Sequence, residues 1–524
     1  MTELYPDFFN DVFGPLMQPG SSSHTAGPCR LGYIANCLLG EEPKEILVRM
    51  DEHGSFAGIF GYMSEDIGMT AGALGFLPDD IRMFTSKEIC AERGIKLDFE
   101  FCHLAASRHP NAVEFVLTGE SGKKAVLCGI SIGGGMVDTV SFNGYELKFT
   151  GDTHLILVFD DASALDHAEL LGRLEGIDCM GHGISEREGG KMHWFRVAAV
   201  PAELPAFNGL DWALIKPLLP VENCSARKPQ LFDTMTKWRQ LAEERNTSLY
   251  EIAIEYEMNA SGWTREQIIE RMKHIAKCMH RQSHAIWDEG VKVLETVEEG
   301  NHYKQWDAYM KAGDVLCGEP IATALRYAYA ARASSPGVLF VPGPMGRGGG
   351  FVYSVLCAVK EHRGYSDEDL LRGLFIAGGV CAIAYTRSNP TGEAIGCAGE
   401  CGVCMAMAAA ALAEMTGAKP QDVENAASLA MQSSVGWPCD VIPGGYWQPC
   451  GSRITLAVSM AIVYADMARA GKLGVLPFHE VLDVADRIGR SLGDDCHCTG
   501  RGGLCTAPTA CEYMEAFNKR REQN

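Results

Sequence analysis

The sequence predicts a multidomain α+β protein with an N-terminal α/β domain, a small β-α-β-β unit and a C-terminal all-α domain. Three observations lead to this prediction. The chain has 524 residues, more than one compact core normally holds. Short apolar runs separated by turns fill the first part, whereas helical periodicity begins at about residue 230. We therefore place the domains at 1–150, 151–205 and 230–524, with a linker at 206–229.

The first two domains are predicted from runs such as EILVRM and KAVLCGISIGGGMVDTVSF, which are typical of strands. In the second domain HLILVFDD is an apolar strand and ALDHAELLGRLEG an amphipathic helix. IDCMGHGISERE and GGKMHWFRVAAV follow as two strands joined at Gly189-Gly190, and several prolines then mark the linker.

The third domain alternates alanine-rich helices with glycine-rich loops. Asn246-Thr247-Ser248 is a plausible helix start. The loops are PGPMGRGGG (342–350), SNPTGEAIGCAGECG (388–402) and DVIPGGYWQPCGSR (440–453). We expect them to face one site.

Composition and charge argue against several classes of protein. The net charge of −21 and the pI near 5.2 argue against nucleic acid as a partner, because a basic face would be needed. The same charge argues against an anionic membrane surface, and no apolar run is long enough to span a bilayer. The N-terminus lacks the pattern of a signal peptide, so we expect a cytoplasmic protein.

The chain has 20 cysteines, many of them between residues 397 and 511. Without a signal peptide, buried thiols, metal ligands or redox chemistry are expected rather than disulfides. Cys397, Cys401 and Cys404 share one helix face. They are either a thin seam of the core or the C-x3-C-x2-C cluster motif of radical S-adenosylmethionine enzymes.

A second set of cysteines consists of Cys397, Cys439 and Cys450, each in or beside a glycine- or proline-rich loop. Loops that converge from separate segments can hold three thiolates around an iron–sulfur cube. Three ligands leave one iron open, and an open iron is a Lewis acid that can help a hydroxyl leave. The alternative is that these cysteines bind structural zinc.

Three further motifs have two interpretations each. His24 lies among the hydroxyls of SSSHTAGP and either caps a helix or binds substrate and transfers a proton. Ser131-Ile132-Gly133-Gly134-Gly135 is an anion nest or a tight turn. Arg501-Gly502-Gly503 binds a carboxylate or caps a helix.

Together these motifs resemble the iron–sulfur-dependent L-serine dehydratases (L-serine ammonia-lyases), in order and over most of the chain. The matching stretches are SSSHTAGP (21–28), SIGGG (131–135), GCAGECG (396–402), Cys439-Asp440, Pro449-Cys450 with Arg453, and RGGL (501–504). The resemblance implies a [4Fe–4S] cluster on Cys397, Cys439 and Cys450, with one iron that has no cysteine ligand. Cys401 and Cys404 would then fill space in the core.

The implied reaction is β-elimination, which converts L-serine to pyruvate and ammonia without pyridoxal phosphate (PLP). The resemblance also makes residues 152–202 look like an ACT domain, a regulatory fold that binds amino-acid effectors at a subunit interface, and thus implies a homodimer. An open iron implies oxygen sensitivity. Some family members cap that iron with a C-terminal cysteine, and Cys511 falls near the position.

We assign site residues on this basis. The catalytic candidates are Ser23, His24 and Thr25. The substrate-binding candidates are Ser21, Ser22, Gly133, Gly134, Arg347, Thr391, Arg453 and Arg501.

Departures from the family pattern keep other functions open. The loop at 341–350 has Met345-Gly346 in place of a Thr-Asn pair and adds Arg347, and residues 62–66 lack the family's histidines. Because polar pocket groups discriminate between substrates, the alternative is the same chemistry on cysteine, threonine or an anionic analogue. A radical S-adenosylmethionine enzyme and a non-catalytic amino-acid sensor are the remaining hypotheses.

Overall fold

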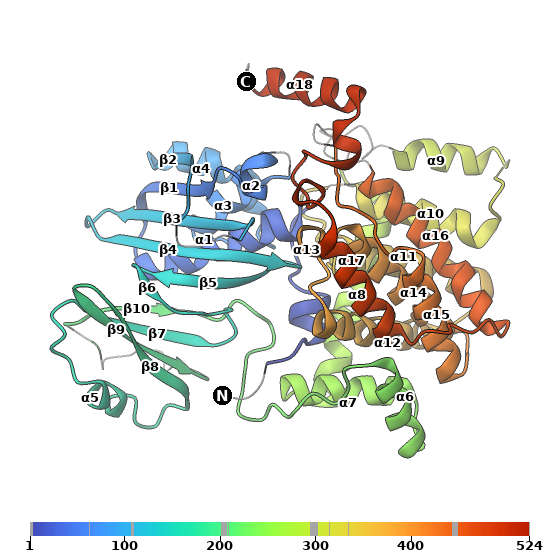
Figure 1. Ribbon diagram of the computed structural model, residues 1–524, viewed down its shortest axis with the longest axis horizontal. Coiled ribbons are helices and arrows are strands. Elements are labelled where there is room, and N and C mark those ends of the chain that lie inside the picture. Colours follow the sequence, from blue (N-terminus) through green and yellow to red (C-terminus); the bar gives the residue numbers. More distant parts are fainter. Residues whose placement is uncertain are drawn as a thin grey trace. The chain divides into compact units, whose positions relative to one another are not determined.

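The structure is a computed structural model that describes residues 4–522 except for 62, 106–108, 201–206, 208, 294–301, 314, 334 and 443–448. The chain forms two compact units (Figure 1). Unit 1 comprises Met1–Leu4 and Ser23–Pro229, and unit 2 comprises Tyr5–Ser22 and Gln230–Asn524. Sequence patterns did not predict that residues 5–22 pack with the helical part of the chain. The boundaries predicted from sequence stay a prediction.

A six-stranded sheet in the order β2-β1-β3-β4-β5-β6 organises the first part of unit 1 (Figure 1). Its strands are β1 (Pro43–Asp51), β2 (Lys96–Cys102), β3 (Ala112–Gly119), β4 (Lys124–Gly133), β5 (Met136–Phe142) and β6 (Tyr145–Glu146). Only β1 and β2 run parallel, and α2 (Ser55–Gly58), α3 (Glu65–Ala73) and α4 (Ser86–Arg93) form the crossover between them. The predicted α/β character of this region is confirmed.

Helix α1 (Gly27–Leu39) follows the SSSHT motif and packs against β3 and β4. Its apolar residues, such as Leu31 and Leu38, join a buried cluster with Phe115 and Leu127 of the sheet. The backbones of α1 and α3 lie close together at Gly72, because a Cβ there would be 2.0 Å from the Cys29 carbonyl oxygen. The sheet and these helices therefore hold the SSSHT motif on a rigid base.

A second, antiparallel sheet has the order β10-β7-β9-β8. Its elements are β7 (His154–Asp160), α5 (His167–Gly172), β8 (Cys179–Arg187), β9 (Gly190–Val197) and β10 (Asp211–Ile215). The predicted β-α-β-β order is confirmed, although α5 is shorter than the expected helix. Strand β10 pairs with β7 and falls in the segment that the sequence assigned to a linker.

Unit 2 is helical in the part that the structure describes (Figure 1). After η1 (Phe8–Val12), its main helices are α6 (Met235–Glu244), α7 (Leu249–Ser261), α8 (Arg265–Asp288), α9 (His302–Lys311), α10 (Glu319–Arg332), α11 (Gly348–Arg363), α12 (Asp367–Arg387), α13 (Gly392–Ile395), α14 (Val403–Met415), α15 (Pro420–Gln432), α16 (Cys450–Arg469), α17 (Phe478–Ser491) and α18 (Pro508–Glu522). Ser248 caps α7 by accepting a hydrogen bond from the Glu251 amide, which confirms the predicted helix start.

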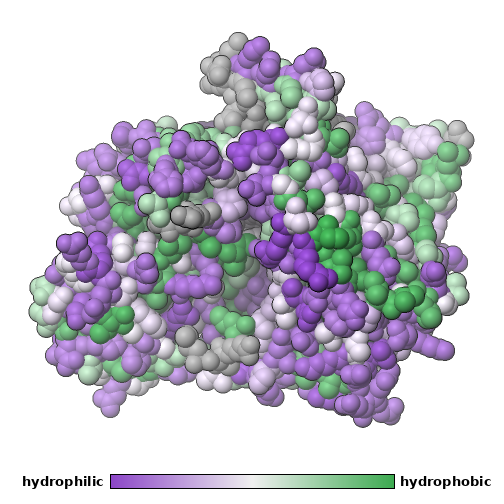
Figure 2. Space-filling model, in the orientation of Figure 1, coloured by the Kyte–Doolittle hydropathy of each residue, from purple (hydrophilic) through white to green (hydrophobic). Residues whose placement is uncertain are grey.

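Helix α14 lies at the centre of unit 2, where it packs against α11, α12, α15 and α16. Its alanines allow this close approach, and nearly all of its residues are buried. The segments Asp367–Arg387 and Ala398–Met415 are long and apolar enough to cross a membrane, yet both are mostly buried inside the unit, as core helices are. On the face drawn in Figure 2, hydrophilic residues predominate and hydrophobic residues form smaller groups, as the net charge leads one to expect.

Candidate functional site

Cys397 lies in a tight turn between α13 and the π-helix η6 (Ala398–Gly402), where its side chain is fully buried. The turn requires glycine at position 396, which has a φ of +75°. A Cβ there would also lie 2.3 Å from the Trp437 carbonyl oxygen. The chain before Cys439 thus passes directly against the turn that carries Cys397.

Cys439 contacts two other thiols. It forms a short bridge with the 496–498 segment, since its amide donates to the Cys496 carbonyl and its carbonyl accepts from the Cys498 amide, both at 2.9 Å. A hydrogen bond with Cys397 lowers the pKa of Cys439, but contact with Cys498 and burial outweigh it and raise the pKa well above the ordinary value. Three buried thiols, those of Cys397, Cys439 and Cys498, therefore meet here.

Asp440 forms hydrogen bonds with two other segments of unit 2. Its Oδ1 accepts a hydrogen bond of 2.6 Å from Arg453 of α16, and its Oδ2 accepts one of 3.0 Å from the Leu504 amide in the RGGL motif. Arg453 also donates to the Pro438 carbonyl at 2.6 Å. Burial lowers the pKa of Arg453, but Asp440 and the neighbouring Cys397 raise it by more, so the guanidinium stays charged beside the thiol.

Cys450 begins α16, and its side chain lies outside the described part of the structure. The next residue, Gly451, meets the buried guanidinium of Arg332, because a Cβ at position 451 would lie 1.6 Å from Arg332 Nη1. Arg332 was not among the residues that the sequence suggested.

Cys401 and Cys404 are buried, and Cys404 packs elsewhere in unit 2. Its thiol donates a hydrogen bond to the Gly343 carbonyl in the 342–350 loop, and a Cβ at Gly348 would lie 2.7 Å from its sulfur. Cys404 therefore packs against the 342–350 loop.

Residues 23–25 of the SSSHT motif belong to unit 1, run into the N-terminus of α1 and are buried. His24 Nε2 lies 2.9 Å from Ser55 Oγ, and its ring stands edge-on to Phe56. The Ser23 carbonyl accepts a hydrogen bond of 2.8 Å from Ser131. The SIGGG motif therefore lies directly against SSSHT.

The SIGGG motif forms the tight turn from β4 to β5, which is one of its two predicted interpretations. Gly133, Gly134 and Gly135 all have positive φ angles, of 98°, 61° and 83°. The Gly135 carbonyl accepts a hydrogen bond of 2.9 Å from the buried guanidinium of Arg30.

Glu65 is a buried acid that the sequence did not single out. Its Oε2 accepts hydrogen bonds from the Gly61 and Met63 amides, at 2.8 and 3.1 Å. Thr25 Oγ1 donates to the Met63 carbonyl at 2.5 Å, which links Glu65 to the motif. Burial raises the pKa of Glu65 to about 8, so this carboxyl holds a proton near neutral pH. Its neighbour Tyr62 lies outside the described residues.

The other predicted residues have these positions. In unit 2, Ser22 lies against Gly346, where a Cβ would be 2.8 Å from the Ser22 amide. Arg347 is buried, stacks over Phe340 and donates to the Arg332 carbonyl at 2.8 Å. Thr391 is buried at the start of α13. Arg501 is exposed and pairs with Asp495 at 3.1 Å, and Ser21 is partly buried.

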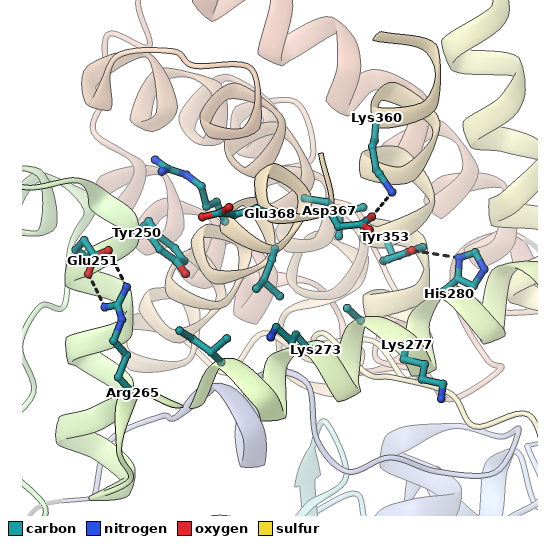
Figure 3. A pocket seen from close by; sticks show the side chains of 15 residues that line it. Tyr250, Glu251, Arg265, Lys273, Lys277, His280, Tyr353, Lys360, Asp367 and Glu368 are labelled. Atoms are coloured by element: carbon teal, nitrogen blue, oxygen red, sulfur yellow. Dashed lines mark hydrogen bonds and ion pairs between the residues drawn. The ribbon is translucent and has the colours of Figure 1, made fainter. Parts of the chain in front are cut away.

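A cavity of about 870 Å³ opens between α7, α8, α11 and α12 of unit 2 (Figure 3). Charged side chains of both signs line it, among them Arg265, Lys273, Lys360 and Asp367. None of the site residues predicted from sequence is among its lining residues.

The chain is similar both to alpha chains and to beta chains of known L-serine dehydratases. The family model described as serine dehydratase alpha chain matches residues 244–505, the segment that holds Cys397 and Cys439. The probable L-serine dehydratase alpha chain of Bacillus subtilis (strain 168) is 29% identical over 285 residues, which cover 54% of this chain and 94% of the relative. The probable L-serine dehydratase beta chain of the same organism is 36% identical over 167 residues, 32% of this chain and 71% of the relative.

A third relative carries the name L-serine dehydratase TdcG, from Escherichia coli (strain K12). It is 32% identical over 146 residues, 28% of this chain and 32% of the relative. With the helical unit and its buried thiols, these matches define the chain as an enzyme of the lyase class. It belongs to the iron–sulfur L-serine dehydratase family.

Proposed function

We propose that this enzyme deaminates L-serine to pyruvate and ammonia, with a [4Fe–4S] cluster held by Cys397, Cys439 and Cys450 and without PLP. The observation that carries the proposal is the contact between the buried thiols of Cys397 and Cys439, beside the charged guanidinium of Arg453. Buried thiols from separate loops are the donor set that an iron–sulfur cluster requires, so these residues fit the group. When bound, the cluster supplies a Lewis-acidic iron that helps the β-hydroxyl leave.

The residues around the thiols prepare the site for a thiolate-rich group. Arg453 keeps its charge and offsets negative charge near Cys397, and Asp440 fixes the guanidinium in place. Burial excludes water from this position and strengthens these electrostatic interactions. The guanidinium favours thiolates, whereas burial raises the pKa of Cys439, so a bound metal is needed to displace the thiol protons.

The SSSHT motif is proposed to bind the substrate and to move its α-proton. Ser23, His24 and Thr25 are the catalytic candidates; the Ser23 carbonyl accepts a hydrogen bond from Ser131, and the Thr25 hydroxyl donates one to the Met63 carbonyl. The contact between His24 Nε2 and Ser55 orients the imidazole. Ser21, Ser22 and the SIGGG glycines are proposed to shape the carboxylate pocket, and Glu65 to hold the motif in its active conformation.

Cys498 is proposed as the capping thiol of the resting enzyme, in place of Cys511. Cys498 contacts Cys439, whereas the Cys511 thiol donates to the Cys505 carbonyl at 3.6 Å. The signal in the sequence was the C-x-C pair at 496–498, which precedes the RGGL motif at 501–504.

Iron, sulfide and zinc content of single-cysteine variants tests the ligand set. We expect about four irons and four sulfides per chain in the anaerobic wild type. Cys397→Ser, Cys439→Ser and Cys450→Ser should lose iron and turnover, whereas Cys401→Ala should retain both. Loss of the cluster in Cys401→Ala with retention in Cys439→Ser would favour the radical S-adenosylmethionine alternative. Zinc without iron at these cysteines would mean a structural site.

Specificity and regulation need separate experiments. Arg347 donates to a backbone carbonyl and stacks on Phe340, contacts that support L-serine rather than an anionic analogue as substrate. Product analysis with L-serine, L-threonine and L-cysteine decides among the substrates. We further propose a cytoplasmic homodimer in which the β7–β10 sheet is an ACT-like unit that binds an amino-acid effector.

A further inference from the structure

Two neighbouring helices of unit 2 bring metal-binding side chains together. His280 and His284 stand one turn apart on α8, and Cys357 lies on α11. One ligand atom from each of the three lies within 4.8 Å of the others. The two imidazoles stack with centroids 4.1 Å apart, and His284 Nε2 is 4.0 Å from Cys357 Sγ. We propose that these three residues, the His280–His284–Cys357 cluster, bind a zinc ion.

The donor types and their spacing fit zinc. Imidazole nitrogen and thiolate sulfur are the usual donors of zinc sites, at about 2.0–2.3 Å from the ion. Tetrahedral geometry at those lengths separates donors by roughly 3.3–3.8 Å. The cluster reaches this spacing when its widest pair closes by about 1 Å, which side-chain rotation supplies without moving either helix.

The His284 ring is oriented as a ligand. Its Nδ1 lies 3.1 Å from the His280 carbonyl oxygen and 2.8 Å from Ser283 Oγ. In the tautomer whose Nδ1–H donates to the carbonyl, the Nε2 lone pair faces Cys357. A backbone carbonyl that fixes the tautomer in this way is the usual outer partner of a metal-bound histidine. Burial also lowers the pKa of His284 to about 4, which leaves the imidazole neutral at physiological pH.

Glu361 is the candidate fourth donor, although its carboxylate must rotate toward the ion, because it lies outside the group whose ligand atoms are within 4.8 Å of one another. It follows Cys357 by one turn of α11, and its Oε1 lies 3.4 Å from Cys357 Sγ. Its Oε2 accepts a hydrogen bond of 2.6 Å from Tyr327, which orients the carboxylate. With the thiol proton displaced by the metal, one thiolate and one carboxylate balance the charge of Zn²⁺.

An entry path is present. His280 lines the 870 Å³ cavity and points toward Tyr353, whose hydroxyl lies 3.2 Å from His280 Nδ1 (Figure 3). His284 and Cys357 are buried, at 7% and 3% exposure. An ion from solvent therefore meets His280 first and reaches the two buried donors behind it.

The test is the zinc content of the full-length protein after incubation with zinc sulfate and removal of loosely bound metal by gel filtration with a weak chelator. We expect about one zinc per chain in the wild type. His284→Gln and Cys357→Ser should each weaken zinc binding by more than the roughly 10- to 100-fold that loss of an outer partner costs. The matched controls are His274→Gln and Cys278→Ser, another one-turn His/Cys pair of α8, whose side chains are 3.8 Å apart; these should retain zinc.

Two comparisons separate this site from the proposed cluster. Zinc binding should persist in Cys439→Ser, because none of its donors is a cluster cysteine. In the wild type, cobalt(II) in place of zinc should give a thiolate-to-metal charge-transfer band, measured as a difference spectrum, that Cys357→Ser removes. Absence of both zinc and this band, or equal zinc in His284→Gln and the wild type, would overturn the proposal even if a variant folds poorly.

Discussion

Arg453 Nη1 donates a 2.6 Å hydrogen bond to Asp440 Oδ1, and this pair joins α16 to the residue that directly follows Cys439. The Asp440 carboxylate is almost fully buried, at 3% side-chain exposure, and Arg453 is at 19%. Removal of one partner from such a pair leaves the other charge uncompensated, which is strongly destabilising.

Asp440→Asn should therefore lower the free energy of unfolding by roughly 3–5 kcal/mol and reduce iron retention. Chemical denaturation and iron analysis measure the two effects. Asp466→Asn, on the helix that carries Arg453, is the control, because Asp466 forms an exposed pair with Arg469 at 3.3 Å and should change stability by less than about 1 kcal/mol. Equal effects of the two substitutions would contradict the role given to Asp440.

Gly396 and Gly417 provide a matched pair of glycines. Both have a φ of +75°, but a Cβ at Gly396 would lie 2.3 Å from the Trp437 carbonyl oxygen, whereas nothing lies within 4 Å at Gly417. Gly417→Ala should cost about 1–2 kcal/mol from backbone strain alone and keep the iron. Gly396→Ala should cost more and lose iron, because the turn that carries Cys397 must move. Iron retained in full by Gly396→Ala would show that the turn does not position the cluster.

The raised pKa of the buried Glu65 carboxyl should make the free energy of unfolding depend on pH. Burial raises its pKa from 4.5 to about 8, so between these values the folded state binds the proton more strongly than the unfolded state. The contribution of Glu65 is fully present below pH 4.5 and is lost as the pH rises through about 8. Glu65→Gln should therefore remove part of the decline in unfolding free energy between pH 5 and pH 8.5, on the order of a few kcal/mol.

Denaturation curves of the wild type and Glu65→Gln across this pH range measure the difference. The control is Glu52→Gln, at an exposed carboxyl that should leave the pH profile unchanged. A Glu65→Gln profile parallel to that of the wild type would mean that Glu65 is already ionised in the folded protein.

The sequence predicted elements whose signal is local. The apolar run at 154–161 contains β7 and Ser248 caps α7, because burial on a sheet and capping depend on neighbours in the chain. It also selected Cys397 and Cys439, whose thiols do meet, because both lie in glycine- or proline-rich loops.

Residues whose role depends on distant partners could not be selected in this way. Cys498 is 59 positions from the thiol that it contacts, and its C-x-C pair has no specific meaning by itself. Glu65 gains its raised pKa only from burial, and Cys357 reaches His284 across 73 positions. Contacts of this range depend on how the helices and loops pack.

The most direct test of the central claim is turnover by the wild-type enzyme, purified and reconstituted without oxygen, with iron and sulfide measured in the same sample. We expect L-serine to yield equal amounts of pyruvate and ammonia, in proportion to the cluster content. A fully loaded cluster that releases neither product from L-serine would contradict the proposed activity. It would mean that the enzyme acts on another substrate.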